Sequence, residues 1–183
     1  MEKELTTALD AVAYACRLTD DVQRSLSSSD VLSKTDNSPV TVADFGSQAV
    51  IGSHIRTKLP LDVIVGEEDD QTIVRERAMM GRVLEYTSRY SAVETEDDLI
   101  RNLSVSAEDP EDSDRYWIVD PIDGTRGFLR GDHYAIALAL IEQGSVVLAV
   151  LGCPTLSSGP WGKNGPRGRI FHAIREQGSF VRR

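Results

Sequence analysis

The first part of the chain places apolar residues at helical spacing. Between residues 5 and 26, apolar or half-apolar side chains recur in steps of three and four, at Leu5, Leu9, Val12, Cys16, Thr19, Val22 and Leu26. Such spacing puts them on one face of a helix, which the polar run at residues 27–30 ends. Cys16 lies on that face, so we expect a small buried side chain rather than a reactive thiol.

A capping signal predicts the second helix. Thr41 and Asp44 have the spacing of a capping box, and the helix that they open would run as far as Pro60. The apolar stretch at residues 61–65 predicts a buried strand ending at Gly66. A further amphipathic helix is expected over residues 73–90, and a polar loop over residues 33–39.

The second part of the chain has the alternation and turn signals of β-structure. The predicted strands cover residues 117–119, 134–141, 145–151, 170–174 and 179–181. Turns at 142–144 and 176–178 predict hairpins, and residues 157–168 form a loop rich in Gly and Pro. The first of these strands is expected to stop at Asp120. Helices followed by mainly antiparallel strands predict an α+β fold, with helices layered on one face of the sheet.

Composition limits the classes of protein to which the chain can belong. The length of 183 residues fits a single domain, and 29 acidic against 20 basic residues give a net charge of −9. Such a charge repels nucleic acid, and no stretch approaches the ~20 apolar residues of a membrane-spanning helix. With two cysteines and no secretory signal at the start, we expect a cytoplasmic protein without nucleic-acid or membrane partners.

Residues 94–114 are strongly acidic. They hold nine Asp and Glu residues and one base, Arg101. We expect a solvated segment rather than a metal site, because metal ligands need packed structure to hold them.

The run DPIDGT at residues 120–125 is the sharpest chemical signal. Pro121 fixes the backbone after Asp120 and Gly124 permits a tight turn, so the two Asp side chains can converge. Two carboxylates and a backbone carbonyl are ligands that suit Mg²⁺; they would come from Asp120, Asp123 and Ile122. The N–H groups of Gly124 and Thr125 would form an anion pocket if they open a helix. The same composition is equally consistent with a simple turn.

Three other acidic residues lie at predicted element boundaries. Glu67 and Glu68 follow the strand at 61–65, and Asp44 opens a helix. Taken alone, the first pair indicates an exposed charged turn and Asp44 a capping residue. Together with Asp120 and Asp123, their positions allow all of these groups to meet at one edge of a sheet.

Three stretches of the chain together resemble one family. They are KTDNSPVTVAD at residues 34–44, VGEED at 65–69 and WIVDPIDGTRGFLRG at 117–131. In this order they are similar to the lithium-sensitive, Mg²⁺-dependent phosphatases of the inositol monophosphatase superfamily. The segments SPVTVAD and GFLRG favour the branch of 3′(2′),5′-bisphosphate nucleotidases. YAIALAL at 134–140 and GCP at 152–154 also fit, so the resemblance covers nearly the whole chain.

The resemblance implies a set of roles for individual residues. The implied Mg²⁺ ligands are Glu67, Asp120, Asp123 and the carbonyl of Ile122. Asp44 and Thr125 would activate the attacking water, with Asp44 accepting the proton, and Glu68 would support a water of the metal's shell. The implied reaction removes the 3′-phosphate of adenosine 3′,5′-bisphosphate to give AMP, a step of sulfur assimilation. 3′-Phosphoadenylyl sulfate and inositol 1,4-bisphosphate remain alternative substrates.

The resemblance also implies a second, C-terminal lobe with a Trp-Asp motif and the contacts to the nucleoside. In this sequence Trp161 is followed by Gly162, and no later Trp-Asp occurs. We therefore expect residues 1–183 to form one N-terminal metal-binding lobe with little activity alone. The alternative is a non-catalytic remnant that binds metal or a partner. An apolar sheet face without that lobe would also permit self-association.

Six further residues are weaker candidates. Lys34 could face a phosphate, but a surface lysine is an equal interpretation. The histidines His54, His133 and His172 lack metal-ligand spacing and are interpreted as structural or surface residues. Arg167 and Arg169 could meet an anion, although we expect solvated charges.

Overall fold

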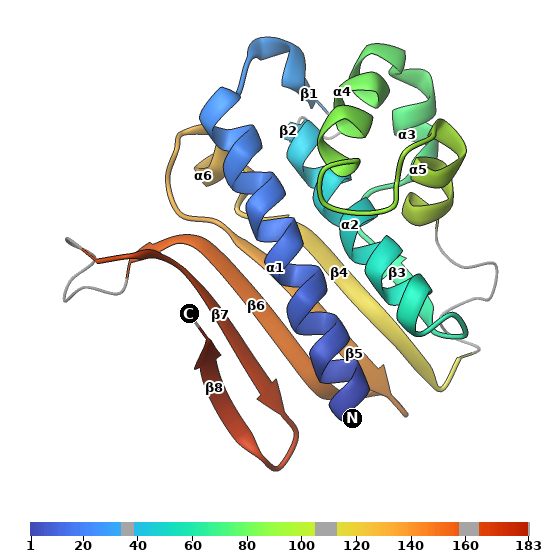
Figure 1. Cartoon of the computed structure of the whole chain (residues 1–183), viewed down its shortest axis with the longest axis vertical. Helices are drawn as coiled ribbons and strands as arrows, with labels where there is room; N and C mark the ends of the chain where they lie inside the picture. The colour runs from blue at the N-terminus through green and yellow to red at the C-terminus, as the bar shows by residue number, and fades with distance from the viewer. Residues whose placement is uncertain (34–38, 105–112, 158–164, 183) are drawn as a thin grey trace.

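Helices occupy the first part of the chain and strands the second (Figure 1). The computed structural model describes residues 1–33, 39–104, 113–157 and 165–182. The helices are α1 (Glu2–Ser25), the 3-10 helix η1 (Ser28–Asp30), α2 (Val42–Lys58), α3 (Asp70–Arg75), α4 (Arg77–Thr87), α5 (Glu96–Leu103) and α6 (Thr125–Leu129). The strands are β1 (Val31–Ser33), β2 (Pro39–Thr41), β3 (Val63–Gly66), β4 (Arg115–Asp123), β5 (Ala135–Glu142), β6 (Ser145–Ser157), β7 (Arg167–Ile174) and β8 (Gly178–Arg182).

The main sheet has six strands in the order β3-β4-β5-β6-β7-β8. Only the pair β3 and β4 is parallel among these neighbours; the other pairs are antiparallel. Helices α1 and α2 run side by side across one face of this sheet, as Figure 1 shows. This arrangement confirms the predicted α+β class with helices on a mainly antiparallel sheet.

Strand alternation separates the two faces of the sheet. On β4, Trp117 and Val119 face the helices and are 0% and 2% exposed, whereas Ile118 between them is 42% exposed. Leu151 on β6 and Val181 on β8 are likewise exposed. A shallow groove of about 400 Å³ runs over the same region and is lined mostly by apolar side chains. The expected exposed apolar face is therefore present.

The first two helices form as predicted. The side chains of Ala8, Val12, Ala15 and Val22 on α1 are fully buried, as the spacing of apolar residues requires. Burial raises the pKa of the Cys16 thiol to about 12, which agrees with an inert side chain. None of the described helices has both the length and the apolar character that crossing a bilayer requires.

The sequence-based boundaries fail in the region between α2 and β4. The helix expected over residues 73–90 is two helices, α3 and α4, separated at Glu76, whose φ and ψ are −105° and 68°. The acidic segment 94–114 is not wholly solvated, because α5 lies within it and buries Leu99 and Leu103. Thr95 caps α5, and acids in its first turn suit the helix dipole. Residues 105–112 lie outside the described part.

Three further predictions need correction. The buried strand expected at residues 61–65 begins only at Val63, because Leu61 lies in a turn and is 94% exposed. β4 does not stop at Asp120 but continues to Asp123. The polar loop expected at residues 33–39 is flanked by β1 and β2, which pair with each other.

The turns of the two later hairpins were predicted correctly, but β6 extends to Ser157 and β7 begins at Arg167, so both strands enter the loop predicted at residues 157–168. At the tip between β5 and β6, Gln143 and Gly144 both have positive φ, 49° and 71°, which is the requirement of a type I′ turn.

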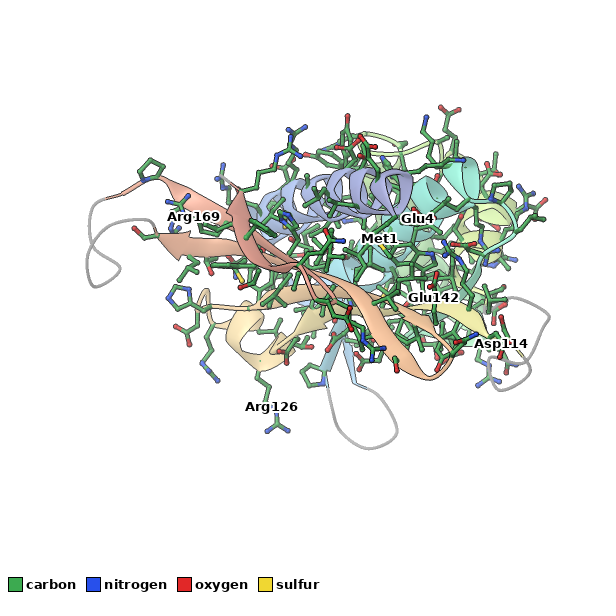
Figure 2. All side chains as sticks on the ribbon, turned by 90° about the horizontal axis from the view of Figure 1, so that it is seen from below. Met1, Glu4, Asp114, Arg126, Glu142 and Arg169 are labelled. Carbon is green, nitrogen blue, oxygen red and sulfur yellow. The ribbon has the colours of Figure 1, made fainter. Side chains whose placement is uncertain are left out.

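Charged side chains gather where α1 begins and β4 starts (Figure 2). Glu4, Asp114 and Glu142 lie on the same side of the molecule in this view, whereas Arg126 projects from its lower edge. At the start of β4, Arg115 bridges α1 and the sheet: its Nη2 lies 3.1 Å from Glu4 Oε1, and its guanidinium also contacts Glu142. The candidate site lies at the opposite end of β4.

Candidate active site

The capping box of α2 brings Asp44 to Thr125. Asp44 is 3% exposed, and its Oδ2 accepts hydrogen bonds from Thr41 N at 2.8 Å and Thr41 Oγ1 at 2.6 Å. Its other oxygen, Oδ1, lies 3.4 Å from the Thr125 hydroxyl, which has the Ile122 carbonyl at 3.2 Å as a second acceptor. The structure thus joins two predicted residues that are 81 positions apart in the sequence.

A β-bulge aligns the two aspartates of β4. Asp120 pairs with Ala137 and Asp123 with Ala135, so three steps on β4 match two steps on β5. The extra residue shifts the alternation by one, and Asp120 and Asp123 consequently lie on the same face of the sheet. Without the bulge, residues three positions apart would point to opposite faces.

Parallel pairing brings Glu67 to the same place. Gly66, the last residue of β3, pairs with Val119 of β4. The next residues along the two strands are Glu67 and Asp120, so Glu67 leaves the sheet beside Asp120, which remains within β4. Glu68 follows and is buried, at 3% exposed.

Repulsion among these carboxylates affects the pKa of Asp120. Burial, then the negative charges of Glu67 and Asp123, raise the pKa of Asp120 to about 6. Asp120 Oδ1 is buried and has no hydrogen-bond partner among the described residues. A buried oxygen in need of a positive partner is what a divalent cation would satisfy.

The turn after Asp123 depends on glycine. Gly124 has φ and ψ of 93° and 41°, in the left-handed region, and α6 starts at the next residue. Gln23 of α1 donates to Phe128 O at 3.0 Å and so holds α6 against the helical layer. Thr125 is thereby fixed between Asp44 and the Ile122 carbonyl.

The donor set fits Mg²⁺. All the candidate ligands are hard oxygen atoms, and Asp120 supplies one that the protein leaves unsatisfied. Over the described ranges, no three or more His, Cys, Asp or Glu side chains already form a group that could hold a metal ion. Mg²⁺ needs few protein ligands and keeps several waters. The ligand set Glu67, Asp120, Ile122 and Asp123 stays a prediction.

Sequence reasoning missed one residue at this site. Gln48 lies one helical turn after Asp44 on α2 and is 2% exposed. Its amide forms hydrogen bonds with both backbone groups of Glu68, at 2.7 Å and 2.9 Å. Its spacing of four from Asp44 was the available signal, because residues four apart share a helix face.

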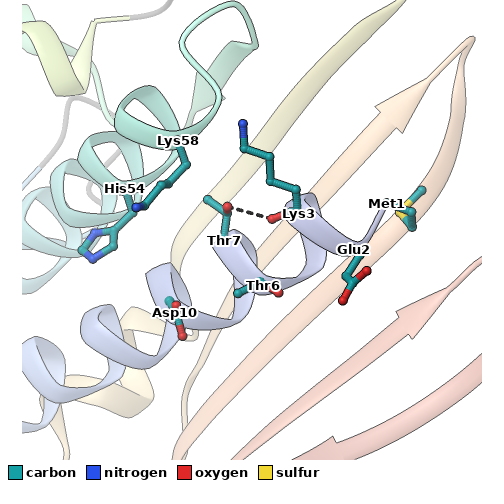
Figure 3. A pocket seen from close by; sticks show the side chains of 8 residues that line it. All are labelled: Met1, Glu2, Lys3, Thr6, Thr7, Asp10, His54 and Lys58. Atoms are coloured by element: carbon teal, nitrogen blue, oxygen red, sulfur yellow. Dashed lines mark hydrogen bonds between the residues drawn. The ribbon is translucent and has the colours of Figure 1, made fainter.

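The side chains of the three histidines have other neighbours, as far as the structure describes them. His54 lines a cavity of about 670 Å³ between the start of α1 and the end of α2, together with Lys3, Asp10 and Lys58 (Figure 3). His133 Nδ1 is 2.9 Å from Thr155 Oγ1, and the ring of His172 stacks on Phe180. These contacts agree with structural or surface roles.

The environment of one basic residue differs from the prediction. Arg169 was expected to be solvated but is only 9% exposed, and its Nη1 donates to Gly168 O at 2.8 Å. Its place in β7, paired with Cys153, explains the burial. Arg167 is exposed, as expected. Lys34 and Trp161 lie outside the described residues.

Comparison with known proteins identifies the family. Residues 1–183 match the inositol monophosphatase family, and the chain belongs to it. The Thermotoga maritima IMPase superimposes with a TM-score of 0.62 at 22% identity, covering 99% of this chain and 51% of that one. An IMPase/NADP phosphatase complexed with Mg²⁺ and phosphate gives a TM-score of 0.50 at 20% identity, over 82% of this chain and 41% of that one.

Within the family, the chain is similar to 3′(2′),5′-bisphosphate nucleotidases. It is 42% identical to 3′(2′),5′-bisphosphate nucleotidase 1 of Arabidopsis thaliana over 167 residues. That match covers 85% of this chain and 47% of the plant protein. The chain thus spans about half the length of the curated relatives that it matches.

Proposed function

We propose that the chain carries the metal-binding and water-activating groups of an Mg²⁺-dependent phosphomonoester hydrolase. Its proposed substrate is adenosine 3′,5′-bisphosphate, which loses the 3′-phosphate to give AMP. The proposal depends mainly on the approach of Thr125 to Asp44, at 3.4 Å, near the acidic residues that follow β3 and lie in β4. The names of the similar nucleotidases support the choice of substrate.

Asp44 and Thr125 can act as a proton relay. Asp44 Oδ2 is already occupied by two donors from Thr41, so Oδ1 is the oxygen that faces Thr125. When the Thr125 hydroxyl donates to Oδ1, its own oxygen can accept a proton from water. The water oxygen then bonds to phosphorus while the bond from phosphorus to the ribose 3′-oxygen breaks. The proton from Thr125 passes to Asp44, and solvent water protonates the leaving 3′-oxygen. A distance of 3.4 Å is long for such a bond, and we expect it to shorten in the substrate complex.

The acidic residues supply the proposed metal site. Glu67, Asp120, Asp123 and the Ile122 carbonyl would hold Mg²⁺, and Glu68 would support a water in its shell. Bound Mg²⁺ would make the attacking water more acidic and spread the negative charge of the phosphoryl group. The Mg²⁺ and phosphate in the structure of the IMPase/NADP phosphatase support this choice of ion. The Gly124 and Thr125 N–H groups are the proposed phosphate donors.

Calorimetry with Mg²⁺ and inorganic phosphate tests the site without requiring turnover. We expect Mg²⁺ to bind and phosphate to bind only when Mg²⁺ is present, because the carboxylates repel an anion otherwise. Phosphate binding that is independent of Mg²⁺, or no Mg²⁺ binding, would contradict the proposal.

Phosphate release distinguishes an enzyme from a non-catalytic remnant. Adenosine 3′,5′-bisphosphate, 3′-phosphoadenylyl sulfate and inositol 1,4-bisphosphate are compared with Mg²⁺, in the presence and absence of Li⁺. For residues 1–183 alone we expect little release, because they span only about half the length of the nucleotidases that they match. Strong, lithium-inhibited release would rule out the remnant.

A further inference from the structure

The side chain of Gln48 binds the backbone of Glu68 in the manner of a neighbouring strand. Its Nε2 donates to Glu68 O at 2.7 Å, and its Oε1 accepts from Glu68 N at 2.9 Å. Glu68 lies two residues beyond the end of β3. One amide side chain therefore satisfies both backbone groups of a buried residue that has left the sheet ladder.

Gly66 makes room for this amide. A Cβ atom at Gly66 would lie 2.2 Å from both Cδ and Nε2 of Gln48 and 2.4 Å from Oε1. These distances are far below any normal contact, so the absence of a side chain at Gly66 lets the Gln48 amide lie against the strand. The second hydrogen of Nε2 is directed to Leu103 O at 3.3 Å, which ties the end of α5 into the same contact.

The hydrogen bonds of Gln48 restrain Glu67, which lies between Gly66 and Glu68. Gly66 is held in the sheet by Val119, and Glu68 is held by Gln48, so the backbone of Glu67 is restrained on both sides. Glu67 carries a charge that acts on Asp120 across the β3–β4 pair. Two like charges move apart unless the structure holds them, and the Gln48 contact supplies that restraint.

Helix α2 links the two halves of the candidate site. Asp44 and Gln48 are one turn apart on its buried side, the first facing Thr125 and the second Glu68. A rigid helix thus sets the spacing between the proton-accepting pair and the acidic strand end.

We propose that Gln48 is a positioning residue that holds Glu67 beside Asp120 for a shared divalent cation. This assignment rests on the proposed function, because it presumes that Mg²⁺ binds there. Gln48 touches neither the ion nor the substrate and acts through the backbone of the segment that bears Glu67. Residues that orient metal ligands in this way alter metal affinity when they are replaced.

The principal variant is Gln48→Met, which keeps the volume and removes all three hydrogen bonds. We expect Mg²⁺ affinity, measured by calorimetry, to fall by about 10- to 100-fold. The amide of Glu68 should also lose its protection in hydrogen exchange measured by NMR, while amides of β5 and β6 keep theirs. Gly66→Ala should reproduce both effects by displacing the same amide, and it replaces Gln48→Met if that variant does not fold.

Arg56→Met is the matched control. Arg56 lies two turns after Gln48 on α2, and its Nη2 donates to Ser104 O at 2.9 Å, so it also ties α2 to a backbone carbonyl at the end of α5. Its side-chain hydrogen bond reaches Ser104 and not the segment of Glu67. We expect its loss to lower the melting temperature and to leave Mg²⁺ affinity unchanged.

The outcomes separate this assignment from the function on which it rests. Equal Mg²⁺ affinity in wild type and in folded Gln48→Met overturns the positioning role alone. An equal loss of affinity in Arg56→Met also overturns it, because the effect would then come from general destabilisation. A wild-type chain that binds no Mg²⁺ overturns the proposed function and the positioning role together.

Discussion

Two buried or half-buried aspartates of this chain have opposite surroundings. Asp30 of η1 is 1% exposed and accepts hydrogen bonds from three donors: Ser27 N at 2.9 Å, Ser27 Oγ at 2.7 Å and Arg82 Nε at 3.0 Å. Asp120 of β4 faces the carboxyls of Glu67 and Asp123, and one of its oxygens has no partner in the described part of the chain. Burial alone thus does not define what an acidic residue does.

The pKa values follow this contrast. Burial raises the pKa of Asp30, but the hydrogen bonds from Arg82 and Ser27 outweigh it and hold that pKa below its ordinary value. The pKa of Asp120 is raised to about 6 by burial and by its acidic neighbours. An acid with internal donors stabilises the fold, whereas an acid held against other acids destabilises it and indicates a functional site.

The largest expected effect comes from removing the charge of Asp120. Asp120→Asn should abolish measurable Mg²⁺ binding in calorimetry, a loss greater than the roughly 10- to 100-fold cost of altering an indirect contact. Asp114→Asn is the control, because Asp114 lies at the other end of β4 and is exposed (Figure 2). Unchanged Mg²⁺ affinity in Asp120→Asn would place the metal elsewhere.

Asp30→Asn should reduce stability without affecting the metal. The variant loses a charged acceptor for Arg82 and part of the capping box of η1. We expect the free energy of unfolding to fall by about 2 kcal/mol, allowing for the partial exposure of Arg82. Urea denaturation measures the loss, and Mg²⁺ calorimetry should give the wild-type value. A change in Mg²⁺ affinity would contradict the separation of the two regions.

The two aspartates should also give opposite dependences on pH in the metal-free chain. Asp30 has a lowered pKa, so its contribution is present above the unfolded value of about 3.9 and is lost as the pH falls through its folded value. Asp120 has a raised pKa of about 6, so the folded chain loses stability as the pH rises from about 4 to about 6.

Melting temperatures from pH 3 to pH 8 measure both effects. Asp120→Asn should remove the decrease between about pH 4 and pH 6, and Asp30→Asn should weaken the decrease at lower pH. Mg²⁺ added at pH 7 should stabilise the wild type but not Asp120→Asn. If both variants follow the wild-type profile, the assigned electrostatic roles are wrong.

The sequence could predict the features of the site that depend on neighbouring residues. The Thr41–Asp44 capping box and the turn at Gly124 are local signals, because residues a few positions apart determine them. The candidate acids were found because they stand at predicted element boundaries, although β4 runs past Asp120 to Asp123. Their convergence depends on the bulge after Asp120 and on the parallel pairing of Gly66, which no local pattern specifies.

Other features depend on contacts between distant segments. Gln48 gave no chemical signal, since an amide on a helix is ordinarily a surface residue, and its partner is 20 positions away. The break at Glu76 and the burial of Leu99 follow from packing of α4 and α5 against α2. Helix propensity and hydrophobic periodicity do not determine such contacts between distant segments.

The smallest expected effect tests whether burial or pairing with arginine makes an aspartate stabilising. Asp20 of α1 also has an arginine partner, Arg24 Nη2 at 2.5 Å, but 73% of the Arg24 side chain is exposed. Water already solvates such a pair, and holding two mobile side chains costs entropy. Asp20→Asn should therefore change the free energy of unfolding by no more than about 0.5 kcal/mol in urea denaturation. If Asp20→Asn lowered the free energy of unfolding as much as Asp30→Asn, pairing with arginine alone would explain why Asp30 stabilises the fold. A smaller loss in Asp20→Asn shows that burial among several donors gives Asp30 its stabilising role.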